Sequence, residues 1–410
     1  MIWFKIAWRN LWRNRRRTGI QLTAIIGGMF LAVFYNNFVG GFAVNTLDGG
    51  VRSGSGHIGF YHERYLENPE VGETVPADDL VAKIEQDPDV SAVFPRLHVA
   101  GLLRSSRDSR PAAAMGLDFA REGDGNPMLN SKNLVAGRMP TTPNGIVIGQ
   151  ALAKELHVKV GKKVVWVSQD VHGEIVSRLF RVSGILNTHV KALDASLIMA
   201  PREAVAELIG RPGSAHEVAV MLKSPDRIPA ALPRLQAIAA TAGGTTKAYA
   251  WDDAMPSLAA LVQASNAKEG FIVVILFALV AVGTMNTMLM SVMERTREFG
   301  MIRAMGVSKG SIRLMVLVEG LVLGLIGSLG GVVLAFLLNL RTSTAGIDLT
   351  KAYGDMDMGG IAFDMLIKTV WDWRLAFLLT AGMLVLSVLA SLYPARWALK
   401  IRPADAMRTY

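Results

Sequence analysis

Four stretches of this chain are apolar enough and long enough to cross a lipid bilayer. A membrane-spanning helix needs about 20 apolar residues, because each helical residue advances only about 1.5 Å through a hydrocarbon core about 30 Å thick. The stretches are residues 20–42, 270–293, 314–340 and 375–393, and Glu319 is the one charged residue in them. At these lengths, four buried core helices of a soluble protein are disfavoured. The sequence therefore predicts an α-helical membrane protein with four transmembrane helices.

The composition agrees with this prediction. Apolar residues make up 51 % of the chain, charged residues only 19 %, and the mean hydropathy is +0.33. The first stretch is predicted to be a retained helix, because it is longer than the apolar part of a secretory signal and no small-residue cleavage site follows it. The chain has no cysteine, which excludes disulfides and thiolate metal sites.

The distribution of charge predicts which segments lie on which side of the membrane. Residues 1–19 contain six basic and no acidic residues, and residues 294–313 and 394–410 are also net basic. Residues 43–269 and 341–374 each carry one more acidic than basic residue. Short basic segments stay in the cytoplasm, so the two termini and the 294–313 loop are predicted inside and the other two segments outside. The net charge of +9 therefore reflects membrane topology, and nucleic-acid binding is not expected.

The first 19 residues are predicted to form a helix that lies in the membrane interface. Their polar face is purely basic, and their apolar residues recur at helical spacing, namely Phe4, Ala7, Trp8, Leu11 and Trp12. Tryptophan favours the depth of the lipid headgroups. The alternative is a simple cytosolic extension of the first span.

The outside segment 43–269 is predicted to be a large α+β domain inserted between the first and second spans. A strand–helix–strand unit recurs, at 56–62, 79–86 and 90–103 and again at 216–224, 228–242 and 245–251. These units predict an α+β part made of residues 43–118 and 214–269. Short strands are predicted between them at 146–148, 163–168, 174–185 and 196–199. Residues 119–213 are therefore interpreted as a second, mainly β, subdomain.

Motifs that would give this chain its own catalytic chemistry are missing from the sequence. There is no Walker A motif, no H-x-x-x-H pair and no nucleophile elbow. Gly54, Gly56 and Gly59 form a G-x-G-x-x-G, but it follows a membrane span and runs into a strand, which is the wrong context for a dinucleotide. No catalytic residue, metal site or enzymatic activity is predicted. Glu319 is expected to pair with Arg313 or with a base of the loop, in preference to serving a proton relay.

The third span contains two tandem small-residue motifs. Glycines four residues apart allow helix backbones to approach closely in lipid. The motifs consist of Gly320, Gly324, Gly327 and Gly331. They predict a packing seam, either within the chain or between two copies of it.

The loop 294–313 is predicted to contain a short amphipathic helix, residues 294–305, which Gly306 ends. It carries charges of both signs beside an apolar patch of Phe299, Met301, Ile302 and Met305. Such a helix, held between two spans, is suited to insertion into the groove of a partner protein.

This loop resembles the FtsX-like permease domain, in which E-R-x-x-E-[FIV]-G-[IM]-[LIM]-[RK]-A-[LM]-G follows the second span. The matching residues are Glu294, Arg295, Glu298, Phe299, Gly300, Met301, Ile302, Arg303, Ala304, Met305 and Gly306. The tail YPARWALKIRPADAMR at 393–408 resembles the end of the same family, and residues 144–165, with GIVIGQALAKELHVKVGKKV, resemble its exported insertion.

The resemblance implies a permease that works with a separate ABC ATPase, which would hold the ATP and magnesium. Ten residues are expected to contact this ATPase, namely Glu294, Arg297, Glu298, Phe299, Gly300, Met301, Ile302, Arg303, Met305 and Gly306. Among them, Glu298 and Arg303 are expected to orient the partner. The chain looks most like permeases of the lipoprotein-release system, which pair around two ATPase copies in the bacterial inner membrane and pass lipoproteins to a periplasmic carrier. The alternatives are permeases like those of the macrolide exporters and the FtsX regulators of cell-wall hydrolases.

A cleft for the acyl chains of a substrate is predicted on the outer half of the first two spans. The candidate lining residues are Phe34, Phe38, Phe42, Phe271 and Ile275. Phe271 and Ile275, on the facing end of the second span, would complete the cleft. A second permease subunit, identical or homologous, is expected as a partner of the chain. The alternative is that these are ordinary lipid-facing side chains.

Overall fold

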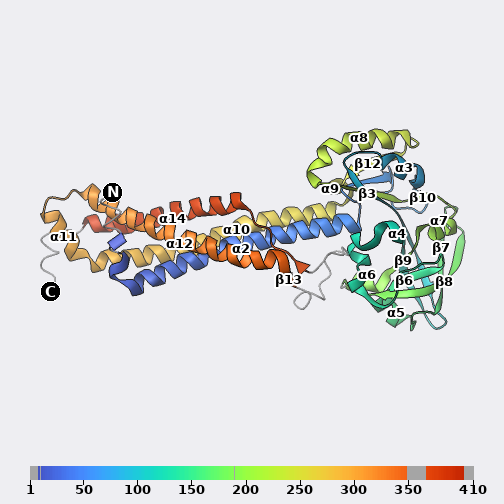
Figure 1. Ribbon diagram of the computed structural model, residues 1–410, viewed down its shortest axis with the longest axis horizontal. Coiled ribbons are helices and arrows are strands. Elements are labelled where there is room, and N and C mark those ends of the chain that lie inside the picture. The colour runs from blue at the N-terminus through green and yellow to red at the C-terminus, as the bar shows by residue number, and fades with distance from the viewer. Residues whose placement is uncertain (1–7, 10, 189, 349–365, 401–410) are drawn as a thin grey trace. The chain divides into compact units, whose positions relative to one another are not determined.

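The computed structural model describes residues 8–9, 11–188, 190–348 and 366–400 (Figure 1). The chain divides into two compact units. The helix unit comprises 1–43, 264–347 and 367–410, and the sheet unit comprises 44–263 and 348–366. Parts of the predicted interfacial helix (1–7 and 10), of the second outside loop (349–365) and of the tail (401–410) lie outside the described residues.

Four long helices contain the four predicted spans. They are α2 (Arg15–Ser53), α10 (Pro256–Glu294), α12 (Lys309–Ala345) and α14 (Trp373–Lys400). By length and hydropathy, each has a section that could cross a membrane, which confirms the predicted spans. The helices exceed the apolar stretches: α2 runs on to Ser53 and α10 begins at Pro256, both within the sheet unit. Only the lipid-embedded part of a helix has to be apolar, so hydropathy could not predict these ends.

The four glycines of α12 pack against two other helices of the same chain. A Cβ atom built on Gly324 would lie 2.6 Å from Ser387 Oγ of α14, and one on Gly331 would lie 2.6 Å from Met29 Cβ of α2. Gly320 faces Ser391 of α14, and Gly327 faces Ile25 of α2. The seam predicted from these motifs therefore lies within the chain, and intramolecular contacts already cover the glycines.

The sheet unit is built on a ten-stranded sheet with the order β12-β1-β11-β3-β4-β9-β6-β8-β5, in which β7 pairs with β3 and β8. Its strands are β1 (Ile58–His62), β3 (Val90–Arg104), β4 (Ser109–Leu117), β5 (Leu134–Gly137), β6 (Gly145–Gly149), β7 (Lys163–Gln169), β8 (Ile175–Leu186), β9 (Leu197–Pro201), β11 (Glu217–Leu222) and β12 (Thr246–Ala250). Two short strands, β2 (Val75–Pro76) and β10 (Ser214–Ala215), pair separately. The main helices are α3 (Ala77–Ile84), α5 (Gln150–Glu155), α7 (Arg202–Leu208) and α8 (Ile228–Thr241). These elements confirm both predicted strand–helix–strand units and the four predicted inner strands.

The long strand β3 belongs to both parts of the sheet. Its first half pairs with β11 and its second half with β4, which in turn pairs in parallel with β9. The predicted start of the inserted part at residue 119 is therefore too late, because the second half of β3 and all of β4 already belong to the inserted sheet. Two apolar cores follow this division: Phe60, Leu80 and Leu235 lie in one, and Leu103 and Trp166 in the other.

Candidate functional site

The loop between α10 and α12 contains one short helix, α11 (Thr296–Ala304), at one end of the helix unit (Figure 1). Gly306 has a φ of +92°, a left-handed conformation that glycine adopts without strain, and it follows the last turn. Ser308 Oγ then accepts a hydrogen bond from the Ser311 amide and caps α12. Both helix ends are thus determined locally, and α11 lies within the predicted helix 294–305.

The inner face of α11 is formed by Phe299, which is completely buried, and Gly300. The guanidinium of Arg295 lies 5.2 Å from the centre of the Phe299 ring. A cation over an aromatic face is attractive, more so when water is excluded. The predicted apolar patch is therefore wrong in one respect: Phe299 anchors α11 to the helix unit and is not part of an exposed surface.

The outer face of α11 presents Met301 and Met305, which are 46 % and 75 % exposed. Arg297 is exposed four residues before Met301, so the three side chains lie on one side of the segment. Ile302 is half-buried at the edge of this face. We call Arg297, Met301 and Met305 the outer face of α11.

Ion pairs hold the 294–313 loop to the start of the chain. Arg13 Nη2 lies 2.6 Å from Glu298 Oε1, and Arg17 Nη1 lies 2.6 Å from Glu294 Oε2. Arg303 donates to the carbonyl of Leu399 over 3.4 Å. Glu294, Glu298 and Arg303 therefore make contacts inside the chain, and the orienting role expected for Glu298 and Arg303 stays a prediction.

Arg295 connects α11 to the buried carboxylate of α12. Its Nη1 lies 3.1 Å from Glu319 Oε2, and its Nε lies 3.2 Å from Glu298 Oε2. The prediction that Glu319 pairs with a base of the loop is confirmed, and the base is Arg295. Burial alone would raise the pKa of Glu298, but the hydrogen bonds from Arg13 and Arg295 outweigh it and hold that pKa below its ordinary value. Glu298 is therefore ionised at neutral pH.

The residues predicted to line a substrate cleft lie on α2 and α10. Phe34, Phe38 and Phe42 are half-buried along α2, and the ring of Phe34 stacks on that of Phe30. On α10, Phe271 and Ile275 are exposed. Exposure alone does not form a cleft, so the cleft stays a prediction.

The sheet unit holds a buried ionic cluster that the sequence reasoning missed. Arg96, on β3, is completely buried, with its Nε 2.6 Å from Glu122 Oε1 and its Nη1 3.3 Å from Glu217 Oε1. Its Nη1 and Nη2 also donate to the carbonyls of Gly54 and Arg52, over 2.5 and 2.6 Å, at the end of α2. A single guanidinium thus joins α2 to both parts of the sheet. The available signal was one arginine inside an apolar strand, VFPRLHVAGLL.

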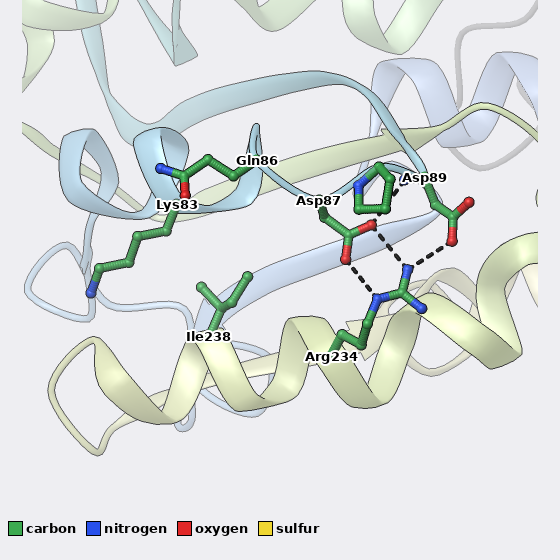
Figure 2. Close-up of a pocket in the computed structure, with 7 residues that line it drawn as sticks. Lys83, Gln86, Asp87, Asp89, Arg234 and Ile238 are labelled. Atoms are coloured by element: carbon green, nitrogen blue, oxygen red, sulfur yellow. Dashed lines mark hydrogen bonds and ion pairs between the residues drawn. The ribbon is translucent and has the colours of Figure 1, made fainter.

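An open hollow of about 600 Å³ on the sheet unit is lined by one lysine and one arginine. Lys83 Nζ donates to Thr241 Oγ1 over 3.3 Å. Figure 2 shows the arginine, Arg234, between two carboxylates, with Nε 2.8 Å from Asp87 and Nη2 2.7 Å from Asp89. The guanidinium is already neutralised by these ion pairs. Within the described ranges, no three His, Asp or Glu side chains are grouped so that they could hold a metal.

Two family models match the chain. The model described as FtsX-like permease C-terminal matches residues 270–403, which include α11. The model described as MacB-like periplasmic core domain matches residues 18–238, which is more than half of the chain. The two matches agree with the two units of the structure.

Curated relatives are similar over most of the chain. The uncharacterized ABC transporter permease YknZ of Bacillus subtilis is 28 % identical over 70 % of this chain and 68 % of its own length. The lipoprotein-releasing system transmembrane protein LolC of Neisseria meningitidis is 24 % identical over 80 % of this chain and 81 % of its own. The macrolide export ATP-binding/permease protein MacB of Haemophilus ducreyi is 24 % identical over 98 % of this chain and 55 % of its own. The chain therefore belongs to the FtsX-like, MacB-type family of ABC transporter permeases.

Proposed function

We propose that this permease converts ATP hydrolysis in a separate ATPase into motion of the sheet unit, and that α11 is the contact through which the ATPase acts. The observation that carries the proposal is the two-sided character of α11. Its inner face is anchored by Phe299 and Arg295, while Met301 and Met305 remain exposed to a partner. Burying a methionine side chain contributes roughly 1.5–3 kcal/mol, so this small face can support a useful contact.

The anchoring contacts would carry a displacement of α11 into the spans. A push on the outer face moves Phe299 and Arg295, and Arg295 is paired with Glu319 of α12. The pairs Arg13–Glu298 and Arg17–Glu294 would pass the same displacement to the start of α2. Since α2 continues to Ser53 in the sheet unit, it is the proposed lever.

The proposed assembly contains two permease subunits, identical or homologous, and two ATPase copies. The exposed residues of α10, including Phe271 and Ile275, would face the second subunit or lipid. We assign the assembly to the bacterial inner membrane, with the sheet unit in the periplasm and α11 in the cytoplasm, because short basic segments stay inside.

We propose a lipoprotein as the cargo, extracted from the inner membrane and passed to a periplasmic carrier. The match to LolC extends over most of both chains, which favours this reading. Efflux of an amphiphile is the second candidate, favoured by the MacB-like core domain and by the similarity to MacB. Release of a lipoprotein from proteoliposomes to a soluble carrier separates the two candidates.

The coupling role is tested by the double variant Met301→Asp/Met305→Asp. We expect it to lose co-purification of the ATPase, because two carboxylates cannot be buried in an apolar groove without a large desolvation cost. Met301→Leu/Met305→Leu is the matched control, since it keeps the apolar volume and should retain the ATPase. Wild-type ATPase binding by the aspartate variant would refute the assignment.

A further inference from the structure

The start of the chain carries three exposed arginines in addition to the two that form ion pairs with the 294–313 loop. Arg13 and Arg17 are paired with Glu298 and Glu294. Arg9, Arg15 and Arg16 are exposed, and no residue of the described ranges forms an ion pair with them. Positive charge is therefore left over at this place after the two glutamates of the loop have been neutralised.

Exposed apolar side chains bracket these arginines along the chain. Trp8 and Trp12 are 44 % and 46 % exposed and touch edge to face, with ring centres 5.9 Å apart. On the other side, Ile20 is 64 % exposed at the start of the apolar section of α2. Tryptophan prefers the headgroup layer and isoleucine the hydrocarbon. In a bilayer, this order would place Arg15 and Arg16 at the depth of the lipid phosphates.

We infer that Arg9, Arg15 and Arg16, with Trp8 and Trp12, form a binding site for the phosphate of an anionic phospholipid. Guanidinium groups bind phosphate oxygens with two parallel hydrogen bonds, and each base near an anionic membrane surface adds to the attraction. A zwitterionic lipid carries a compensating cation, which the surplus positive charge repels. The chemistry therefore selects a lipid with a net negative headgroup.

The site is directly connected to α11. Arg13 and Arg17 lie among the lipid-binding arginines in the sequence. Each places a guanidinium nitrogen 2.6 Å from a carboxylate oxygen, Arg13 on Glu298 and Arg17 on Glu294. A bound lipid that fixes this segment also fixes Arg13 and Arg17, and through them α11. An anionic lipid is thus assigned a regulatory role at the coupling helix, and this second step rests on the proposed function of α11.

Lipid binding is tested on the full-length permease alone, without an ATPase. Native mass spectrometry from detergent would compare retention of phosphatidylglycerol with that of phosphatidylcholine. We expect the wild type to retain phosphatidylglycerol selectively and Arg15→Gln/Arg16→Gln to bind it more weakly, by about fivefold for each arginine removed. The control Arg110→Gln/Arg121→Gln removes the same charge from two exposed arginines of the sheet unit and should leave retention unchanged.

Two results would overturn the site. Equal retention of the two lipids, or undiminished retention by Arg15→Gln/Arg16→Gln, means that this segment binds no anionic lipid. Arg15→Lys/Arg16→Lys, which keeps the charge needed for insertion, guards against misfolding and should retain measurable selectivity.

The connection to α11 is tested by hydrogen exchange of residues 296–304 in nanodiscs, again with the permease alone. Phosphatidylglycerol should slow exchange in α11 of the wild type, and the effect should vanish in Arg15→Gln/Arg16→Gln. Unchanged exchange would refute the regulatory step. It would leave the proposed ATPase contact untouched, because that contact is tested separately by Met301 and Met305.

Discussion

The two units each hold a cluster of arginine–glutamate pairs, and the clusters differ in their exposure to solvent. In the sheet unit, Arg96 is completely buried, and Glu122 and Glu217 are buried around it. In the helix unit, the side chains of the Arg13–Glu298 pair are 57 % and 34 % exposed. Breaking a buried pair leaves an isolated charge in a low dielectric, whereas an exposed pair exchanges its partner for water. Arginine–glutamate pairs are therefore costly to break in the sheet unit and cheap to break at α11 in the helix unit.

This difference suits the two positions. The Arg96 cluster holds the end of α2 to both parts of the sheet, which moves as one body in the proposed mechanism. The pairs at α11 hold an element that, in the proposed mechanism, shifts in every ATPase cycle. The Arg295–Glu319 pair combines features of both clusters, because it is buried like the Arg96 pairs but lies in the helix unit beside the exposed pairs of α11.

The largest effect is expected for Arg96→Met. It leaves Glu122 and Glu217 without their cation and removes the donors to the carbonyls of Arg52 and Gly54. The stability of the sheet unit should fall by about 3–5 kcal/mol. Urea unfolding of the full chain in detergent measures this loss, followed by fluorescence in a background that keeps the buried Trp166 and has phenylalanine at the other tryptophans.

The control for Arg96 is an arginine with an exposed partner. Arg110 lies 2.8 Å from Glu155, and both side chains are nearly half exposed. Arg110→Met should cost less than about 1 kcal/mol. Equal losses for the two variants would show that burial does not distinguish the pairs.

Glu319→Gln tests the Arg295–Glu319 pair. Arg295 would keep Glu298 but lose its buried partner on α12. A hydrogen bond to a charged group contributes roughly 1.5–3 kcal/mol, so we expect a loss of about 2 kcal/mol in the stability of the helix unit. Thermal unfolding in detergent measures it, and Glu294→Gln, at the more exposed Arg17 pair, should be milder. A larger loss of stability for Glu294→Gln than for Glu319→Gln would show that the Arg17–Glu294 pair contributes more.

Acidification should affect the sheet unit before the helix unit. All seven histidines of the sequence fall in the sheet unit. Burial lowers the pKa of His216 from 6.5 to about 4, so the unfolded chain takes up a proton before the folded one does. This contribution to stability is complete above pH 6.5 and is lost as the pH falls toward 4. The expected loss between pH 7 and 5.5 is about 1 kcal/mol.

The same urea measurement, repeated at pH 7 and pH 5.5, tests the histidine. His216→Gln should reduce the pH dependence, because the buried titrating ring is gone. His157→Gln is the matched control, since His157 is 61 % exposed beside Asp108. A wild-type slope in His216→Gln would assign the acid sensitivity to another group.

The smallest effect on stability is expected for Arg13→Gln. The pair it breaks is largely exposed, so the cost should stay below about 1 kcal/mol. Hydrogen exchange in α11 should nevertheless rise, and high salt should reproduce the effect in the wild type by screening the pair. A stability loss as large as that of Arg96→Met would remove the distinction between the two clusters.

Local patterns predicted most of the elements but not the sides they present. The apolar runs predicted all four spans, and the sequence also predicted eight of the ten strands of the main sheet, missing β4 and β5. On α11, the pattern grouped Phe299 with Met301 into one patch. Successive helical residues are about 100° apart, so two positions two residues apart point in nearly opposite directions. Apolar residues on both sides of a short helix do not reveal which side is the inner one.

The sequence by itself determined the number and positions of the membrane-crossing helices, because lipid requires continuous apolarity within one short segment. It also determined that α11 lies between two spans and ends near Gly306. Only the tertiary structure decided that the glycines of α12 pack within the chain, that β3 is shared by the two parts of one sheet and that Arg96 is buried among its partners. The partners of Arg96 are 26, 42, 44 and 121 residues away in the sequence. A pattern within a short stretch of sequence cannot predict such partners, because only the folded backbone brings them within hydrogen-bonding distance.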